Sequence, residues 1–255
     1  MNILLVYAQP EPSSLTQHLV REAEKFLLQH NHRVSHSDLY AMGWKSVMDE
    51  ADFTQRKVSE RLSFIHESEN AFSTGTQAED IHIEQQKLQA ADALILLFPL
   101  WWFSMPAIMK GWIDRVWAYG LAYGYKNAGN RYRYGEGAFA GKRALLTVSI
   151  GGPSVDYGSR GINGKLDDLL FPITHGTMFY TGMEVLPTFA IYNSGKLNET
   201  MMKNVTENWQ KRLYTLFSES PISFRLQNGG DYSDGHTLNP PIKTNATGLS
   251  IHHRD

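Results

Sequence analysis

The residues best suited to chemistry lie in an aromatic loop that directly follows a strongly apolar stretch. Residues 93–97 form a continuous hydrophobic run, which is typical of a parallel strand buried on both faces. Ligands of open α/β sheets bind outside the carboxyl ends of the strands. We therefore expect the loop to form one wall of a site for a flat, partly apolar ligand, for which a flavin ring is the best candidate. The loop contains Pro99, Leu100, Trp101, Trp102 and Phe103.

A second loop, residues 9–16, is rich in hydroxyl side chains and leads into a predicted helix. Ser14 and Gln17 have the spacing of a capping box. The free backbone N–H groups and the dipole of a helix N-terminus favour a phosphate, and Ser13 and Thr16 would add hydroxyl donors. Simple capping of the helix is the alternative explanation.

A pair of glycines, Gly151 and Gly152, ends another apolar stretch at residues 142–150. Glycines at this point allow a planar ligand to approach the backbone closely, although an ordinary turn would also use them. All three loops follow strands, so they belong at one edge of one sheet. Their convergence favours a flavin site over three unrelated features.

Strand and helix patterns alternate along the chain, which predicts a parallel sheet. The expected fold class is α/β, a flavodoxin-like doubly wound five-stranded parallel sheet of order 2-1-3-4-5, with its switch point between strands one and three. The expected strands are residues 3–8, 33–39, 93–98, 142–150 and 185–192, and the expected helices are residues 14–27, 81–91, 106–116, 166–170 and 199–217.

The remaining segments are expected to be irregular. Residues 44–78 are interpreted as a long surface excursion with room for short helices. Residues 118–141 hold six glycines and five tyrosines, and long loops in compact domains tend to be functional. We expect a flavin-binding domain over residues 1–217, followed by an irregular C-terminal extension over residues 218–255 that packs on it or extends from it.

Composition excludes several other classes of function. The 255 residues carry a net charge of −2, which gives no basis for binding nucleic acid or an anionic membrane. Without cysteine there is no disulfide, thiolate metal site or cysteine nucleophile, and the ten histidines show no metal-ligand spacing, so no metal is expected. The apolar run at residues 93–103 is shorter than the ~20 residues that cross a bilayer. The N-terminus lacks signal-peptide features, so a cytoplasmic protein is expected.

Motifs in the aromatic loop, in the glycine loop and in other parts of the chain resemble the NAD(P)H:quinone oxidoreductase family of the DT-diaphorase type, within the flavodoxin-like superfamily. The resemblance runs from about residue 3 to about residue 217. Its motifs are Ser37-Asp38-Leu39-Tyr40-Ala41-Met42, Phe98-Pro99-Leu100-x-Trp102-Phe103-x-x-Pro106-Ala107-Ile108-x-Lys110-Gly111-Trp112-x-x-Arg115-Val116, Ala122-Tyr123-x-Tyr125, Gly151-Gly152-x-x-x-x-Tyr157 and Gly161-Ile162-x-Gly164.

The resemblance implies a homodimeric NAD(P)H dehydrogenase (quinone). Such an enzyme transfers hydride from NAD(P)H through bound FAD to quinones in a two-electron, ping-pong reaction, in an active site shared between subunits. The flavin would contact Gln9, Ser13, Ser14, Leu15 and Thr16 on its phosphate side, Pro99, Leu100, Trp101, Trp102 and Phe103 along the ring and ribityl chain, and Ser149, Ile150, Gly151, Gly152 and Tyr157 at the reactive edge. The substrate would contact Tyr123 and Tyr125 of the partner subunit, with Tyr180 on another wall.

Tyr157 and Asn163 are the implied catalytic residues, and Asn163 is also a departure from the family. The family usually has histidine at the positions of Asn163 and Gln9. Asparagine also occurs in the mammalian paralogue that prefers dihydronicotinamide riboside, so the hydride donor stays open. A basic residue that helps to hold the FAD phosphates in mammalian members is Met202 here, which leaves FMN as an alternative to FAD.

Three other functions remain open from the sequence. A flavodoxin-like electron carrier or regulatory flavoprotein would bind flavin, but the aromatic-rich loop at residues 118–134 argues against the exposed flavin edge that a carrier needs. An FMN-dependent azo or nitro reductase would use the same site with another acceptor. A structural interaction protein would bind no flavin at all.

Overall fold

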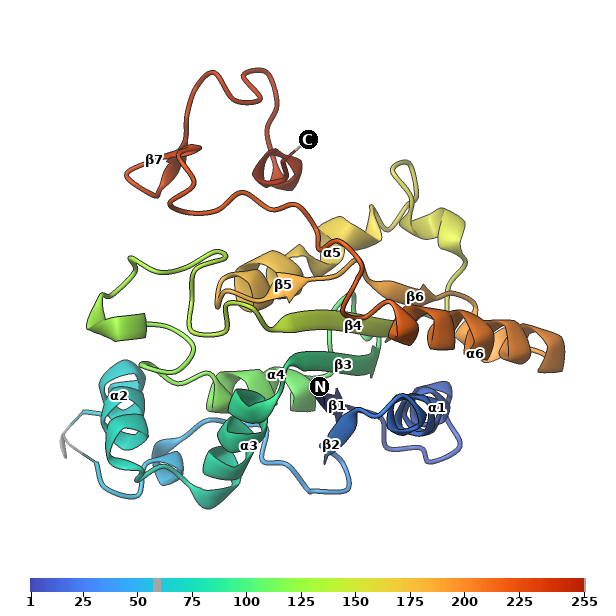
Figure 1. The fold of residues 1–255 in the computed structure, drawn as a ribbon, viewed down its shortest axis with the longest axis horizontal. Coiled ribbons are helices and arrows are strands. Elements are labelled where there is room, and N and C mark those ends of the chain that lie inside the picture. Colours follow the sequence, from blue (N-terminus) through green and yellow to red (C-terminus); the bar gives the residue numbers. More distant parts are fainter. Residues whose placement is uncertain (57–60, 255) are drawn as a thin grey trace.

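A parallel sheet with helices on both faces forms the body of the protein (Figure 1). The computed structural model describes residues 1–56 and 61–254. The sheet has the order β2-β1-β3-β4-β5, with β6 also paired to β4. Its members are β1 (Asn2–Tyr7), β2 (Arg33–Asp38), β3 (Ala93–Pro99), β4 (Arg143–Ser149), β5 (Glu184–Val185) and β6 (Phe189–Ile191). The order and the parallel pairing confirm the predicted flavodoxin-like class.

The α-helices connect these strands. They are α1 (Leu15–Gln29), α2 (Phe64–Thr74), α3 (Glu79–Ala90), α4 (Ala107–Val116), α5 (Leu166–Ile173) and α6 (Glu199–Tyr214). Helix α2 lies inside the expected surface excursion at residues 44–78, of which residues 57–60 lie outside the described part of the chain. The predicted end of the last helix at residue 217 was three residues too late.

The predicted strand at residues 185–192 was wrong as a single strand. It is divided into β5 and β6, and Pro187 lies in the gap, where it has no N–H to donate to the ladder. Ala144 pairs with Val185 and Thr147 pairs with Phe189. The outer strand therefore advances four residues while β4 advances three, so one extra residue is accommodated as in a bulge.

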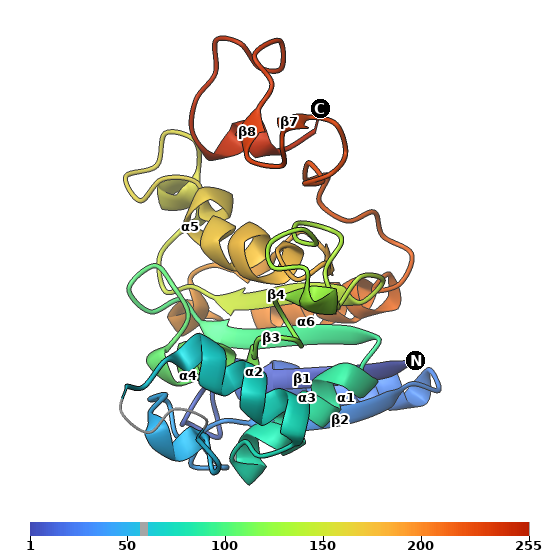
Figure 2. The same cartoon turned by 90° about the vertical axis from the view of Figure 1, so that its left-hand side faces the viewer.

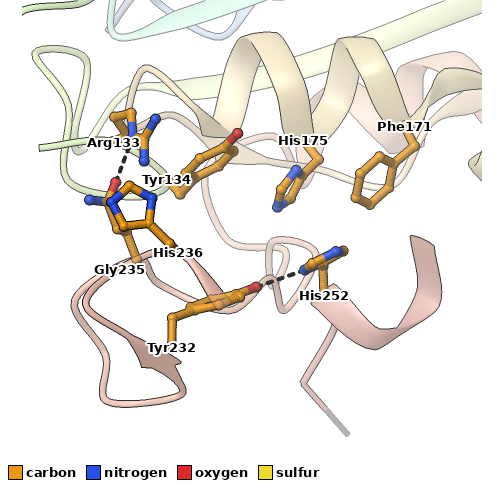
Figure 3. A pocket seen from close by; sticks show the side chains of 9 residues that line it. Arg133, Tyr134, Phe171, His175, Tyr232, Gly235, His236 and His252 are labelled. Carbon is orange, nitrogen blue, oxygen red and sulfur yellow. Dashed lines mark hydrogen bonds between the residues drawn. The ribbon is translucent and has the colours of Figure 1, made fainter. Parts of the chain in front are cut away.

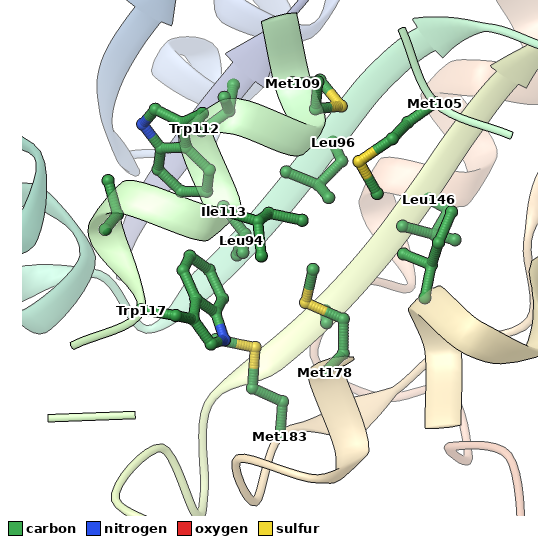
Figure 4. Close-up of a cluster of buried hydrophobic side chains, with 14 of the residues drawn as sticks. Leu94, Leu96, Met105, Met109, Trp112, Ile113, Trp117, Leu146, Met178 and Met183 are labelled. Atoms are coloured by element: carbon green, nitrogen blue, oxygen red, sulfur yellow. The ribbon is translucent and has the colours of Figure 1, made fainter. Parts of the chain in front are cut away.

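Two hydrophobic cores lie on the opposite faces of the sheet. Side chains of β3 alternate between them: Leu94 and Leu96 face one core, and Ala93 and Ile95 face the other. Burial on both sides explains why this strand is a continuous apolar run. Figure 4 shows the first core, where side chains of α4 such as Trp112 pack over β3 and β4 beside methionines of the chain after α5.

A buried ion-pair network anchors the surface excursion to α4. The Arg115 guanidinium is 1% exposed and donates to Asp52 at 2.9 Å and to Asp80 at 2.7 Å. Lys45 also contacts Asp52 at 2.9 Å. Because a buried charge must be paired, the arginine of the family motif fixes this part of the fold.

The C-terminal extension lies over α5 and carries the short hairpin of β7 (Tyr232–Ser233) and β8 (Thr237–Leu238) (Figure 2). Ile222 N–H donates to the carbonyl of Val185 at 2.7 Å. Phe224 is buried against Phe179, with ring centroids 5.0 Å apart. The extension thus has apolar contacts with the body. No α-helix in the described ranges is long and apolar enough to cross a bilayer.

Candidate functional site

The three loops singled out in the sequence meet at one cavity of about 400 Å³ at the carboxyl edge of the sheet. It lies beside the switch point between β1 and β3, where ligands of this architecture bind. Its lining residues are Gln9, Leu15, Thr16, Pro99, Leu100, Trp101, Ser149, Gly151, Ser194 and Gly195.

Backbone hydrogen bonds hold these loops together. Leu100 N–H donates to the carbonyl of Ser149 at 2.9 Å, which joins the aromatic loop to the end of β4. Ser194 N–H donates to the carbonyl of Ile150 at 2.9 Å, and Asn193 N–H donates to the carbonyl of Gly152 at 3.0 Å. The loop after β6 is thereby joined to the glycine loop, and it brings Ser194 into the cavity.

Ser194 and Gly195 were missed by sequence reasoning. The available signal was their position directly after the last strand, whose carboxyl end must reach the same edge of the sheet as the others.

The loop before α1 presents donors suited to an anion. Ser14 Oγ accepts from Gln17 N–H at 3.2 Å, so the serine half of the predicted capping box is present, but the Gln17 side chain donates to the Gln9 carbonyl at 3.3 Å and does not complete the box. Ser13 donates from its backbone N–H and its hydroxyl to one Glu11 oxygen, at 3.0 and 2.5 Å. These bonds hold the pKa of Glu11 below its usual value. The loop therefore already binds a carboxylate, and a phosphate would use the same donors after displacing it.

The aromatic loop contains a strained two-residue turn. Trp101 and Ser104 exchange backbone hydrogen bonds of 3.0 and 3.1 Å, while Trp102 and Phe103 have φ values of +50° and +62°. A turn with positive φ at both central residues favours Asn-Gly, because larger side chains are strained there. Trp102 is also 94% exposed. Trp102 and Phe103 raise the free energy of this turn and belong to neither hydrophobic core. Their presence therefore indicates a contact outside this chain or with a ligand.

Replacing Trp102 by asparagine together with Phe103 by glycine is therefore expected to stabilise the flavin-free protein. Relief of the left-handed strain should raise the free energy of unfolding by about 1–3 kcal/mol, measured by urea denaturation. The control is Val155→Asn, which changes a 73% exposed apolar residue that has no positive φ. A double variant no more stable than wild type would show that the turn is not strained.

Tyr157 and Asn163 lie on the same loop after β4. Tyr157 packs on Tyr192, with ring centroids 5.8 Å apart, and a Cβ added to Gly152 would lie 3.3 Å from its ring. Asn163 N–H donates to the carbonyl of Asp156 at 3.0 Å, which folds the loop back beside Tyr157. The two predicted catalytic residues thus lie on one folded loop that starts at the cavity residue Gly151, although neither of them lines the cavity.

The other predicted cofactor residues surround the cavity without lining it. Trp102 and Phe103 turn outward, and Ile150 is buried in the core, with its N–H bonded to the carbonyl of Ile191 at 2.8 Å. In the described part of the chain, eight of the fifteen predicted residues line the cavity. The seven that do not are Ser13, Ser14, Trp102, Phe103, Ile150, Gly152 and Tyr157.

The predicted substrate residues lie at the opposite edge of the sheet. Tyr123 and Tyr125 follow α4, and Tyr180 follows the π-helical segment Thr174–Phe179 after α5, so both segments lie where the helices end and the strands begin. Figure 1 shows the loop after α4 on the left and the loop after β4 on the right. Burial raises the pKa of Tyr123, as do the neighbouring hydroxyls of Tyr180 and Tyr119. The structure therefore groups Tyr123 with Tyr180, away from the cavity of the same chain.

No group of three or more metal-ligating side chains occurs among residues 1–56 and 61–254. The cavity is instead apolar along the aromatic loop and rich in hydroxyl and backbone donors elsewhere. Such a surface suits a ligand with a flat ring and an anionic tail.

Comparison with known proteins agrees with this description. The chain matches the Flavodoxin_2 family model, described as a flavodoxin-like fold, over residues 1–213. It is 43% identical to a ribosyldihydronicotinamide dehydrogenase-like protein of Penicillium crustosum, with 91% of this chain and 87% of that protein covered. It is 35% identical to NAD(P)H dehydrogenase [quinone] 1 of Rattus norvegicus, with 98% and 92% covered. A crystal structure of a proposed quinone reductase from Klebsiella pneumoniae is 48% identical over the full length of both chains, with a TM-score of 0.95.

Proposed function

The chain belongs to the flavodoxin-like family of NAD(P)H:quinone oxidoreductases, and from this premise we propose that it is a flavin-dependent NAD(P)H dehydrogenase (quinone). The observation that carries the proposal is the meeting of the three loops at the carboxyl edge of the sheet, in a cavity of about 400 Å³. An electron carrier is less well supported, because the relatives that cover most of the chain carry the names of dehydrogenases.

The residues present fit a flavin. Gly151 has open space within 4 Å of the position where a Cβ would lie, so a ring can approach the backbone there. Trp101 and Leu100 supply an apolar wall, and the N-terminus of α1 supplies donors for phosphate. When bound, the flavin would accept hydride from a dihydronicotinamide and pass it to a quinone.

We propose FAD as the resident flavin, with FMN as the alternative. FMN stays the alternative because Met202, near the start of α6 and just beyond the cavity loop that contains Ser194, offers no charge to a second phosphate. Titration of the flavin-free protein with each flavin, followed by fluorescence, tests this proposal. Tighter binding of FAD supports it, and tighter binding of FMN would assign the site to FMN.

Tyr157 and Asn163 are proposed to act at the reactive edge of the ring. The hydroxyl of Tyr157 and the amide of Asn163 can each donate a hydrogen bond to negative charge placed there, but both donors are uncharged. A protonated histidine at position 163 would bring a positive charge to the same hydrogen bond, so it would stabilise that negative charge better.

Asn163→His is accordingly expected to raise the rate constant of flavin reduction by about tenfold while leaving the flavin dissociation constant nearly unchanged. Anaerobic stopped-flow absorbance measures the first quantity, and fluorescence titration measures the second. Asn245→His, at an exposed position of the C-terminal extension, is the matched control. Equal reduction rates in Asn163→His and wild type would contradict this role.

We further propose that the active site is shared in a homodimer. Tyr123 and Tyr125 lie at the edge of the sheet opposite to the cavity, so they could meet a flavin only in another copy of the chain. A twofold dimer would place each tyrosine loop over the partner's cavity. A cytoplasmic location and freedom from nucleic acid and membrane partners remain predictions from the sequence.

Mixing two variants that are impaired in different parts of the proposed site, at a flavin concentration too low to load the first of them, tests the shared site. One carries Gly151→Leu and the other carries Tyr123→Ala with Tyr125→Ala. After the subunits exchange at random, half of the dimers are mixed. In each mixed dimer one of the two sites combines an intact cavity from one subunit with intact tyrosines from the other. The mixture should therefore recover about a quarter of wild-type quinone reduction. A mixture no more active than the mean of its parents would show that each chain works alone.

A further inference from the structure

A second cavity, of about 310 Å³, lies between the body and the C-terminal extension (Figure 3). Within the described residues, it shares no lining residue with the cavity at the carboxyl edge of the sheet. The side chains that define its chemistry are Arg133, Tyr134, Phe171, His175, Tyr232 and His252.

Two layers of aromatic rings face this cavity. In the layer that belongs to the body, His175 stacks between Tyr134, at 4.8 Å and 27°, and Phe171, at 4.4 Å and 18°. In the layer that belongs to the extension, Tyr232 and His252 are parallel within 17°, and the tyrosine hydroxyl contacts His252 Nδ1 at 2.9 Å. Figure 3 shows the layers on opposite sides of the space. Because Tyr134 and Phe171 cover the faces of His175, the body layer meets a ligand with ring edges, and an aromatic edge packs well against the face of a planar ring.

His175 contributes an unsatisfied polar atom to this cavity. The residue is only 8% exposed, and its Nε2 has no hydrogen-bond partner among the described residues. Burial, together with the nearby His252 and His253, lowers the pKa of His175 to about 4, so the imidazole is neutral at pH 7. Buried polar atoms normally have a partner, so this nitrogen points to a ligand that can form a hydrogen bond.

The charge on the described residues that line the cavity is positive and comes from Arg133. Arg133 donates from Nε to Gln227 at 2.9 Å, and its guanidinium lies over the rings of Tyr134 and Tyr180, at 5.5 and 5.9 Å. No carboxylate pairs with Arg133 in the described part of the chain, and none of the nine described lining residues is acidic. An arginine that faces aromatic surfaces with its outer nitrogens unpaired is suited to a carboxylate.

Asp231, which neighbours the cavity residue Tyr232 in the sequence, does not offset this charge. Its carboxylate is paired with Arg225 at 2.9 Å, and Arg254 lies 3.6 Å from the same oxygen. The negative charge of Asp231 is therefore offset by two arginines, and an anionic ligand would meet little repulsion from this residue.

We propose that this second cavity binds a planar aromatic carboxylate of one or two fused rings. The ring would lie against the stacked side chains, the carboxylate would contact Arg133, and His175 Nε2 would gain a hydrogen-bond partner. A volume of about 310 Å³ limits the ligand to this size. Within one chain the site shares no described lining residue with the proposed flavin cavity, but Arg133 lies over the ring of Tyr180, so in the proposed dimer the site would border the partner's substrate pocket.

Calorimetric titration of the flavin-loaded protein with 2-naphthoate and with neutral 2-naphthamide tests the proposal. We expect one naphthoate site per chain and at least tenfold weaker binding of the amide, since charged bidentate contacts are the strong ones. Arg133→Gln should abolish the preference for the acid, and His175→Phe should weaken naphthoate while preserving ring stacking. Arg131→Gln, whose guanidinium lies over Tyr132, is the matched control and should behave as wild type.

Several results would overturn the proposal. These are absence of naphthoate binding, equal affinity for acid and amide, and equal losses in Arg133→Gln and Arg131→Gln. Titration of the Gly151→Leu variant separates this site from the flavin cavity: retained naphthoate binding supports an independent site, and lost binding would place the ligand in the flavin cavity. Because calorimetry reads binding without turnover, failure of the proposed enzymatic function would leave this test intact.

Discussion

Gly151→Leu is expected to weaken flavin binding by about ten- to a hundredfold without unfolding the protein. A Cβ at this position meets no atom within 4 Å, and Gly151 does not have a positive φ, so leucine fits the apo fold. Its side chain would project into the cavity that the residue lines. Overpacking of a filled site costs about 1–3 kcal/mol, which corresponds to this range of affinity.

Fluorescence titration with FAD measures this affinity, and circular dichroism checks that the variant is folded. Gly176→Leu is the matched control, because that glycine also has open space around its Cβ position and lies in the π-helical segment after α5, outside the cavity. Unchanged flavin affinity in Gly151→Leu would remove the glycine loop from the cofactor site.

Tyr157→Phe is expected to lower turnover with quinone by about ten- to a hundredfold, by analogy with the loss of one donor that stabilises developing charge. Phenylalanine keeps the ring that packs on Tyr192, so flavin affinity and folding should change little. Steady-state turnover at saturating substrate, with flavin occupancy measured in parallel, separates the two effects.

Tyr214→Phe provides the control for this change, because the side chain of Tyr214 is 73% exposed at the end of α6. Equal turnover in Tyr157→Phe and wild type would reduce Tyr157 to a packing residue. A fall in flavin affinity of the same size as the fall in turnover would instead place its hydroxyl in cofactor binding.

The parts of the fold that follow from local pattern were predictable from the sequence. The apolar run at residues 93–97 predicted a central strand, and the order of strands and helices predicted the sheet order. Topology then predicted that the loops beginning at Gln9, Pro99 and Gly151 would meet, because the carboxyl ends of parallel strands share one edge.

Features that depend on contacts between distant residues were not predictable. The break at Pro187 depends on how two strand pieces share β4, and the strain at Trp102 contradicts the usual preference for glycine. The second cavity joins Tyr134, His175 and Tyr232, which no sequence periodicity relates. Nothing in the local sequence indicates that the C-terminal extension stacks its rings opposite those of the body.

The central claim is that a bound flavin cycles between a dihydronicotinamide and a quinone. Anaerobic stopped-flow mixing of the flavin-loaded protein with NADPH, NADH and dihydronicotinamide riboside tests it most directly. The account predicts rapid bleaching of the flavin band by at least one of these donors and recovery of the band when menadione is added. A bound flavin that none of the three donors bleaches would contradict the proposed reductase activity and leave an electron carrier as the function. A protein that binds neither FAD nor FMN would contradict the cofactor site itself.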